Sequence, residues 1–248
     1  LWHGAPGYLY GYGLTPLPSA HAQIAFSMAG VITEVDSLPV ARFPLKLGAR
    51  VGVGGNVELA FFGSLISNSA PLLDRWGGGF SATWVPLRAG ALPVFLAGVS
   101  GGAAYRTPDL DGVYSGPDTL ADYPGFFVAA PVGVAVGPAR VTIAPELRLT
   151  PAPISIDAPA SANRWTPYAY LKSALAFDWG NLSAAASASV RSVPLRQPFA
   201  VDAPFQMGAE LNWVIPGSSL VVSGFAAGEF ESWADFYVMG GGGLGVLF

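Results

Sequence analysis

The sequence predicts an all-β fold, a transmembrane antiparallel up-and-down β-barrel of about twelve strands. Three observations support this prediction. First, the 248 residues are 52% hydrophobic and only 11% charged, whereas soluble domains carry about 25% charged residues. Second, apolar residues alternate with small or polar residues in one segment after another, which is the period of a β-strand. Third, 32 Gly and 22 Pro are spread through the apolar segments, and both residue types disfavour membrane-spanning helices.

The alternation gives the strands in chain order. Residues 20–29 form the first predicted strand. Residues 43–53 and 57–65 form a hairpin around residues 54–56, whose Gly-Gly-Asn sequence tolerates the positive φ of a tight turn. A three-residue loop also keeps apolar residues opposite apolar residues across this hairpin. The remaining strands are predicted at residues 76–84, 91–104, 126–136, 141–149, 165–179, 182–190, 201–213, 220–231 and 236–248.

These strands are near the roughly 9–11 residues that cross a bilayer at a tilt. Short connections alternate with longer ones, so an even strand number places both chain ends on the side of the short turns, which are predicted near 54–56, 86–90, 137–140, 180–181 and 214–219. One feature fits this pattern badly. Five prolines lie inside predicted strands, where each removes a ladder hydrogen bond: Pro44, Pro131, Pro145, Pro167 and Pro204.

Tryptophan residues gather at the ends of the predicted strands. Trp84, Trp179 and Trp213 lie at the short-turn ends, and Trp76, Trp165 and Trp233 lie at the opposite ends. Two aromatic girdles of this kind are expected at the two interfaces of a membrane. The alternative is that Trp simply occurs at strand ends in a soluble β-protein. A soluble barrel or sandwich would, however, carry far more Lys and Glu on its outer face.

The last thirteen residues, 236–248, alternate to the final Phe248, with Val246 and Leu244 two and four positions earlier. This ending resembles the closing strand of bacterial outer-membrane β-barrel proteins. The resemblance implies an outer-membrane location in a diderm bacterium, a lipid bilayer around the barrel, and an ending that the barrel-assembly machinery reads. No basic stretch followed by an apolar one stands at the start of the sequence, so we expect a mature N-terminus.

If the apolar parity faces lipid, the small and polar parity faces an enclosed interior. The charged residues expected to line this interior are Arg42, Lys46, Arg50, Glu58, Glu146, Arg148, Lys172, Arg191, Asp202, Glu210 and Glu229. One interpretation is a polar channel whose charge is basic near the second and third strands and acidic near the tenth and eleventh. The other is a set of salt bridges that fill a narrow barrel. The sequence leaves both open.

Other kinds of chemistry find little support in the sequence. The net charge is −4 without a basic stripe, which argues against nucleic acid as a partner. Cys is absent, and no phosphate loop or metal-ligand spacing occurs. Outer-membrane barrels that are lipases carry a His-x-Ser arrangement, which neither His3 nor His21 matches. We therefore predict no enzymatic activity, no cofactor and no metal.

The predicted organisation is an N-terminal periplasmic or plug segment, residues 1–19, followed by the barrel, residues 20–248. The predicted function is an outer-membrane channel for passive diffusion of small hydrophilic solutes. The alternative is a structural barrel subunit that anchors a larger cell-envelope complex, with periplasmic envelope proteins as partners.

Overall fold

The computed structural model describes residues 12–35, 38–68, 73–106, 125–152, 164–191, 205–230 and 236–248. All their regular elements are strands: β1 (Ala22–Val35), β2 (Leu38–Gly54), β3 (Val57–Asn68), β4 (Leu73–Ala89), β5 (Val94–Arg106), β6 (Gly125–Ala129), β7 (Val132–Val136), β8 (Ala139–Ala152), β9 (Arg164–Trp179), β10 (Leu182–Arg191), β11 (Phe205–Val214), β12 (Leu220–Phe230) and β13 (Phe236–Leu247). Within these ranges no helix is long and apolar enough to cross a membrane.

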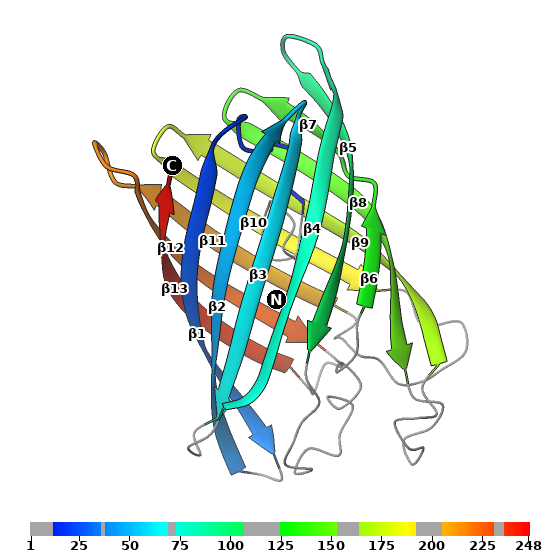
Figure 1. Cartoon of the computed structure of the whole chain (residues 1–248), viewed down its shortest axis with the longest axis vertical. Coiled ribbons are helices and arrows are strands. Elements are labelled where there is room, and N and C mark those ends of the chain that lie inside the picture. The colour runs from blue at the N-terminus through cyan, green and yellow to red at the C-terminus, as the bar shows by residue number, and fades with distance from the viewer. Residues whose placement is uncertain are drawn as a thin grey trace.

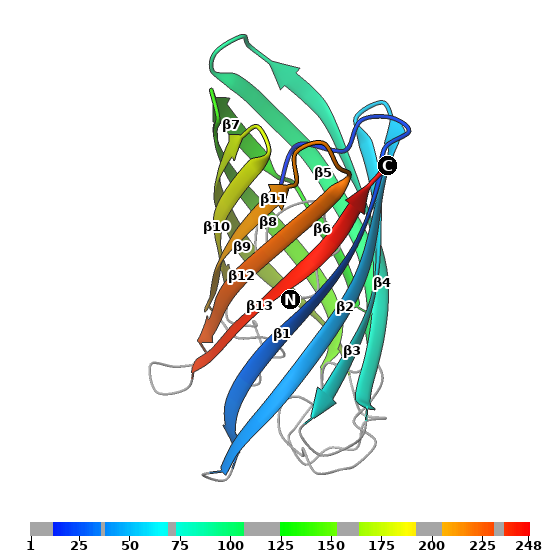
Figure 2. The ribbon, with the colours of Figure 1, turned by 90° about the vertical axis from the view of Figure 1, so that its left-hand side faces the viewer.

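The strands form one closed antiparallel barrel (Figure 1). Strands adjacent in the sequence pair with each other, except β6 with β7. β1 pairs with β13 from Gln23–Leu247 to Ile32–Val238, which closes the cylinder (Figure 2). Strands β6 and β7 are two halves of one strand, because both lie between β5 and β8. The barrel therefore has twelve strands, and the predicted fold class is confirmed.

Two of the five interior prolines, Pro131 and Pro145, are explained by the break between β6 and β7, whereas Pro167 lies in the continuous β8–β9 register opposite Leu149. The Pro131 carbonyl accepts a bond from the Gly98 amide of β5, and the Pro145 carbonyl accepts one from the Ala130 amide. In an antiparallel ladder the N–H and C=O of a residue point to the same neighbour, so the two missing proline N–H groups both fall at this break. Pro44 similarly lies in a gap of the β1–β2 register. Pro204 lies outside the described residues.

Five short turns lie at one end of the barrel, called here the short-turn end, at residues 55–56, 90–93, 137–138, 180–181 and 215–219. It is the upper end in Figure 1. In the first turn Gly54, Gly55 and Asn56 have φ of 96°, 59° and 60°, as the Gly-Gly-Asn sequence predicts. The predicted turn at 86–90 was displaced, because β4 continues to Ala89 and the chain turns at 90–93.

The distribution of side chains is the reverse of that in a soluble protein. Large apolar residues on every strand are exposed, among them Phe61 (51%), Leu171 (56%) and Leu211 (49%). Charged and hydroxyl side chains such as Glu58 (0%) and Lys172 (2%) are buried instead. An apolar outer surface with a polar interior is stable only where hydrocarbon replaces water around the barrel.

Candidate functional site: the barrel interior

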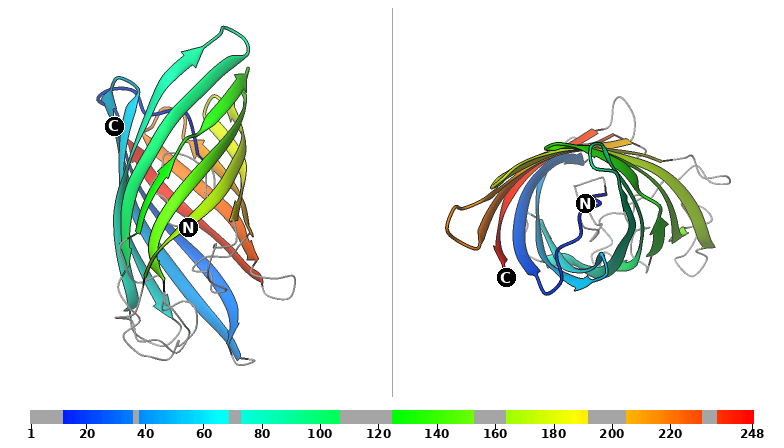
Figure 3. Two further views of the ribbon diagram at one scale, coloured as in Figure 1. Left: turned by 90° about the vertical axis from the view of Figure 1, so that its right-hand side faces the viewer. Right: turned by 90° about the horizontal axis from the view of Figure 1, so that it is seen from above.

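Residues 12–19, which precede β1, enter the barrel near its short-turn end, where hydrogen bonds join them to two different walls. We call residues 12–19 the N-terminal segment. On one wall, the Leu17 amide donates to the Glu58 carboxylate at 2.8 Å. On the other wall, Thr142 donates its hydroxyl to the Tyr12 carbonyl at 2.8 Å. Seen from above, the segment passes from the rim into the space enclosed by the strands (Figure 3).

Leu14 packs this segment into a small apolar cluster with Val85 and Leu96, all at most 6% exposed. The neighbouring strands have glycine at the positions that face Leu14. A Cβ added at Gly98 or Gly133 would lie 3.0 or 3.1 Å from a Leu14 methyl group, which is tighter than ordinary van der Waals contact. Small residues at these positions therefore make the room that Leu14 occupies.

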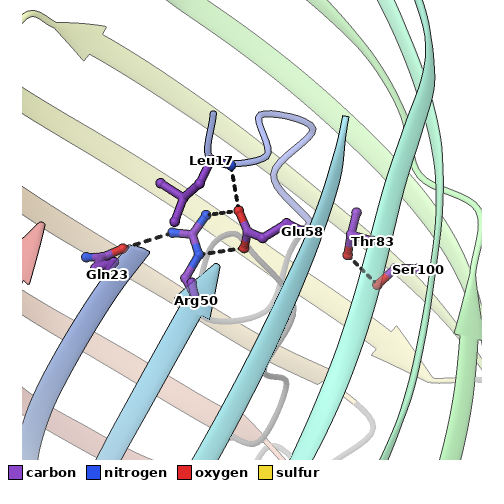
Figure 4. A network of polar contacts seen from close by, with 6 residues as sticks. All are labelled: Leu17, Gln23, Arg50, Glu58, Thr83 and Ser100. Carbon is purple, nitrogen blue, oxygen red and sulfur yellow. Dashed lines mark hydrogen bonds and ion pairs between the residues drawn. The ribbon is translucent and has the colours of Figure 1, made fainter. Parts of the chain in front are cut away.

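The anchor on the first wall is the ion pair between Arg50 of β2 and Glu58 of β3. The Arg50 Nε and Nη2 atoms donate to the two Glu58 oxygens at 2.6 and 2.8 Å, a bidentate arrangement that fixes both side chains. Arg50 Nη1 also donates to Gln23 of β1 at 3.2 Å (Figure 4). Because Glu58 also accepts the Leu17 amide, this network fixes the N-terminal segment to three strands.

The second wall carries a buried ionic cluster around Glu146 of β8, whose side chain is fully buried. Lys172 of β9 lies 2.8 Å from one Glu146 oxygen, and Arg148 donates to the other at 2.8 Å. The Tyr12 hydroxyl also donates to Glu146. Burial, with the adjacent carboxylate, raises the pKa of the Tyr12 phenol above its usual value, so the hydroxyl stays protonated as a donor.

Aromatic rings complete this wall. The Arg148 guanidinium lies 4.4 Å from the Tyr170 ring centre, and the Lys172 ammonium lies 5.3 Å from that of Tyr12. Arg191 of β10 lies 5.7 Å from the Tyr168 ring centre. Cation–π contacts of this kind stabilise cations that are withdrawn from water. The interior is therefore crowded along β8, β9 and β10.

The interior is different along β11, β12, β13 and β1. There the residues of the inward parity are mostly small or polar and keep partial exposure, in contrast to the fully buried groups on β8 and β9. They include Ala25, Ser27, Gly208, Glu210, Asn212, Ser223, Gly241 and Gly243. We call this set the small-residue wall. The same side also carries Phe225 at an inward position and the buried residues Gln206, Val221 and Ala227. The barrel interior is thus asymmetric, with a crowded charged side and a side on which small or polar groups predominate.

The structure describes the side chains of some predicted interior charges but not of others. Arg50 forms an ion pair with Glu58, and Glu146 forms ion pairs with both Arg148 and Lys172. Arg191 is 8% exposed. Glu210 is partly exposed on the small-residue wall. For Arg42, Lys46 and Glu229 the structure describes the backbone alone, and Asp202 lies outside the described residues. The predicted segregation of basic and acidic strands therefore stays a prediction.

At the short-turn end, Trp84, Trp179 and Trp213 are 51%, 53% and 45% exposed on the outer surface. Trp179 stacks on Phe177 with ring centres 5.4 Å apart. The side chains of Trp76 and Trp165 are not among those described, and Trp233 lies outside the described residues. The girdle function stays a prediction. Of the predicted assembly signal, Leu244 and Phe248 are exposed and Val246 is partly buried.

Sequence reasoning missed the contacts that join the N-terminal segment to the strands. Arg140, which the sequence pattern places in a turn, lies in β8, pairs with Asp178 at 2.7 Å and donates to the Thr15 hydroxyl at 3.0 Å. Tyr168 and Tyr170, two inward aromatic residues next to Lys172, were a usable signal for a crowded wall. Tyr12 carried no such signal, because its partner is 134 residues away.

His21 is exposed, and its Nδ1 atom lies 3.1 Å from the Ser19 carbonyl oxygen. His3 lies outside the described residues. Within the described part of the chain, no three His, Asp or Glu side chains come together in a way that would hold a metal ion.

No protein-family model matches the sequence, and no curated protein matches it. Solved structures do match. The KdgM porin has a TM-score of 0.50 at 7% identity, covering 90% of this chain and 98% of that one. The translocator domain of the autotransporter NalP from Neisseria meningitidis has a TM-score of 0.49 at 13% identity, covering 94% and 90%. An active-site mutant of outer membrane phospholipase A from Escherichia coli has a TM-score of 0.46 at 11% identity, covering 97% and 94%.

At such low identity a structural match concerns the fold alone, and similar folds serve different activities. The match to the porin agrees with the closed antiparallel barrel, the apolar outer surface and the polar interior described above. This chain therefore has the closed antiparallel barrel fold that outer-membrane β-barrel proteins such as the KdgM porin share, and the matches single out no particular subfamily.

Proposed function

We propose that the protein is an outer-membrane channel of a diderm bacterium through which small hydrophilic solutes diffuse passively. The observation that carries the proposal is the asymmetric interior. Polar and ionic groups are drawn inward in a barrel whose outside is apolar. Water and solutes would interact with such an interior more favourably than with the outer surface.

The small-residue wall marks the path that we assign to the solutes. Small inward side chains leave more cross-section than the Tyr, Lys and Arg side chains on β8 and β9. Ser27, Asn212 and Ser223 supply hydrogen-bonding groups along this wall without closing it, and all three keep partial exposure. Hydrated solutes can exchange water contacts for these groups.

The N-terminal segment lies across part of the short-turn end, so we propose that it narrows the channel there. This is the plug alternative for residues 1–19. It is supported by the buried positions of Tyr12 and Leu14, each 1% exposed, and by hydrogen bonds to β3 and β8. A segment held at two walls obstructs solute passage more than one that lies along a single wall.

Planar-bilayer conductance tests the channel. The purified barrel should give stable current steps in KCl, and deletion of residues 1–17 should enlarge each step, since Ala22 and the β1–β13 closure stay intact. Heat-dependent mobility in detergent gels should show that both forms are folded barrels. A folded barrel that conducts no ions, with or without residues 1–17, would refute the proposal.

Two further assays separate this function from the alternatives. If the barrel is a structural subunit, the folded protein should be non-conducting and co-purify with a periplasmic partner in fixed proportion. If it is a phospholipase, it should hydrolyse phospholipid at a rate that falls in the His21→Ala variant. A conducting barrel with neither property supports the channel alone.

A further inference from the structure

Arg191, the last residue of β10, differs from the other arginines described in the interior. Its side chain has the inward parity of Ser187 and Ser189, and it is 8% exposed. Its Nε and Nη1 atoms are buried and form no hydrogen bond with the described residues. The side chain lies against the Tyr168 ring, and no ion pair among the described residues includes it.

The contrast with its neighbours matters because a buried guanidinium is costly without an anion. Arg50 is paired with Glu58, Arg140 with Asp178 and Arg148 with Glu146. Each of these arginines has a carboxylate within 2.8 Å. Among the described residues, the contact found for Arg191 is the aromatic face of Tyr168, which interacts with its charge but accepts no hydrogen bond from Nε or Nη1.

A second group without a partner lies next to Arg191. The Ser189 hydroxyl is buried, with the residue 2% exposed, and forms no hydrogen bond with the described residues. Two residues apart on one strand, Ser189 and Arg191 point to the same side of the sheet. Both therefore offer donors to the same region of the interior.

The charge of the described residues around Arg191 is positive. Lys172 is the register partner of Ser189 on β9, and Arg148 is on the next strand. Three cations, Arg148, Lys172 and Arg191, face one described carboxylate, Glu146. On the other side of β10, the described carboxylate of β11 is Glu210, in register with Ala185, four residues before Ser189. That separation is roughly 13 Å along the strand, so Glu210 does not neutralise Arg191.

We propose that Arg191 and Ser189 form a binding site for the carboxylate group of small organic anions that pass through the barrel. A carboxylate accepts several hydrogen bonds in one plane and matches the donors of a guanidinium. Lys172 and Arg148 form ion pairs with a single carboxylate, Glu146, so one net positive charge remains to attract the anion into this region. Gln206 of β11, in register with Ser189, links the site to β11, the first strand of the small-residue wall. This proposal specifies which class of solute the channel binds, so it rests on the proposed function.

The test compares gluconate with sorbitol, two solutes of nearly the same size of which the first carries a carboxylate. In planar bilayers, gluconate should reduce the KCl current of the wild-type barrel in a saturable manner, and sorbitol should not. The Arg191→Gln variant should raise the half-blocking gluconate concentration by roughly tenfold, as loss of a charge-assisted hydrogen bond would. Ser189→Ala should raise it by a smaller factor with little effect on folding.

Arg88→Gln is the matched control, because it removes the same charge from an exposed residue at the short-turn end of β4. It should leave the gluconate block unchanged. Equal gluconate block in the wild-type, Arg191→Gln and Ser189→Ala barrels would overturn the binding site, as would an equal change in the Arg88→Gln variant.

Failure of the site is distinguishable from failure of the channel. If no form conducts, the proposed function fails, and the thermal unfolding midpoint with and without gluconate then decides the site. Gluconate that raises the midpoint of the wild-type barrel but not of the Arg191→Gln barrel supports the site. Equal shifts in the two forms, or none, overturn it.

Discussion

The Glu146→Gln substitution tests whether the buried ionic cluster stabilises the barrel. Gln keeps the shape of the side chain and an acceptor for the Tyr12 hydroxyl, but it removes the negative charge. Lys172, which is 2% exposed, then loses its ion pair at 2.8 Å, and Arg148 loses its pair at the same distance. Removing one partner of a buried ion pair costs about 3–5 kcal/mol, because the remaining charge stays buried without compensation.

The free energy of unfolding of the barrel in lipid vesicles, followed by Trp fluorescence during denaturant titration, should therefore fall by about 3–5 kcal/mol. Asp178→Asn is the matched control. It removes the same charge from the Arg140–Asp178 pair at 2.7 Å, in which the Asp178 side chain is 46% exposed, so its cost should be only about 0–1 kcal/mol.

The double substitution Glu146→Gln with Lys172→Met should recover part of the loss, because an apolar side chain needs no counter-charge. The reasoning would be refuted by a Glu146→Gln barrel as stable as the wild type, or by equal effects of Glu146→Gln and Asp178→Asn. Either result would mean that water or ions compensate Lys172 without Glu146.

Two further substitutions test the N-terminal segment and the lipid-facing surface. In Gly52→Ala the added Cβ would clash with the carbonyl oxygens of Pro18 and Leu17, so the Leu17 amide should exchange hydrogen faster. In Gly63→Ala the added Cβ meets nothing within 4 Å, so this variant should not change the exchange rate of the Leu17 amide. Leu171→Lys, in the middle of β9, should lower the free energy of unfolding in bilayers by about 2–4 kcal/mol. Trp179→Lys, at the end of the same strand, should lower it by only about 0–1 kcal/mol. Equal losses at the two positions would mean that the bilayer midplane does not lie at Leu171.

The sequence by itself determined the strands and their two faces. Each strand is a local pattern, because the pleat alternates side chains whatever lies across the barrel. Phe61 and Leu211 could thus be assigned to the outer surface, and Glu58 and Lys172 to the interior, before any coordinates were known. The turn at residues 54–56 was equally local, since Gly and Asn tolerate the positive φ that it needs.

Only the tertiary structure decided which inward groups meet. The Tyr12–Glu146 contact joins residues 134 positions apart, and nothing in a period of two specifies it. Three further features depend on how the strands are staggered when the cylinder closes. They are the path of the N-terminal segment, the position of Pro131 and Pro145 at the same break, and the absence of a described counter-ion for Arg191. Stagger is a property of the closed sheet as a whole, so the alternation of a single strand carries no information about it.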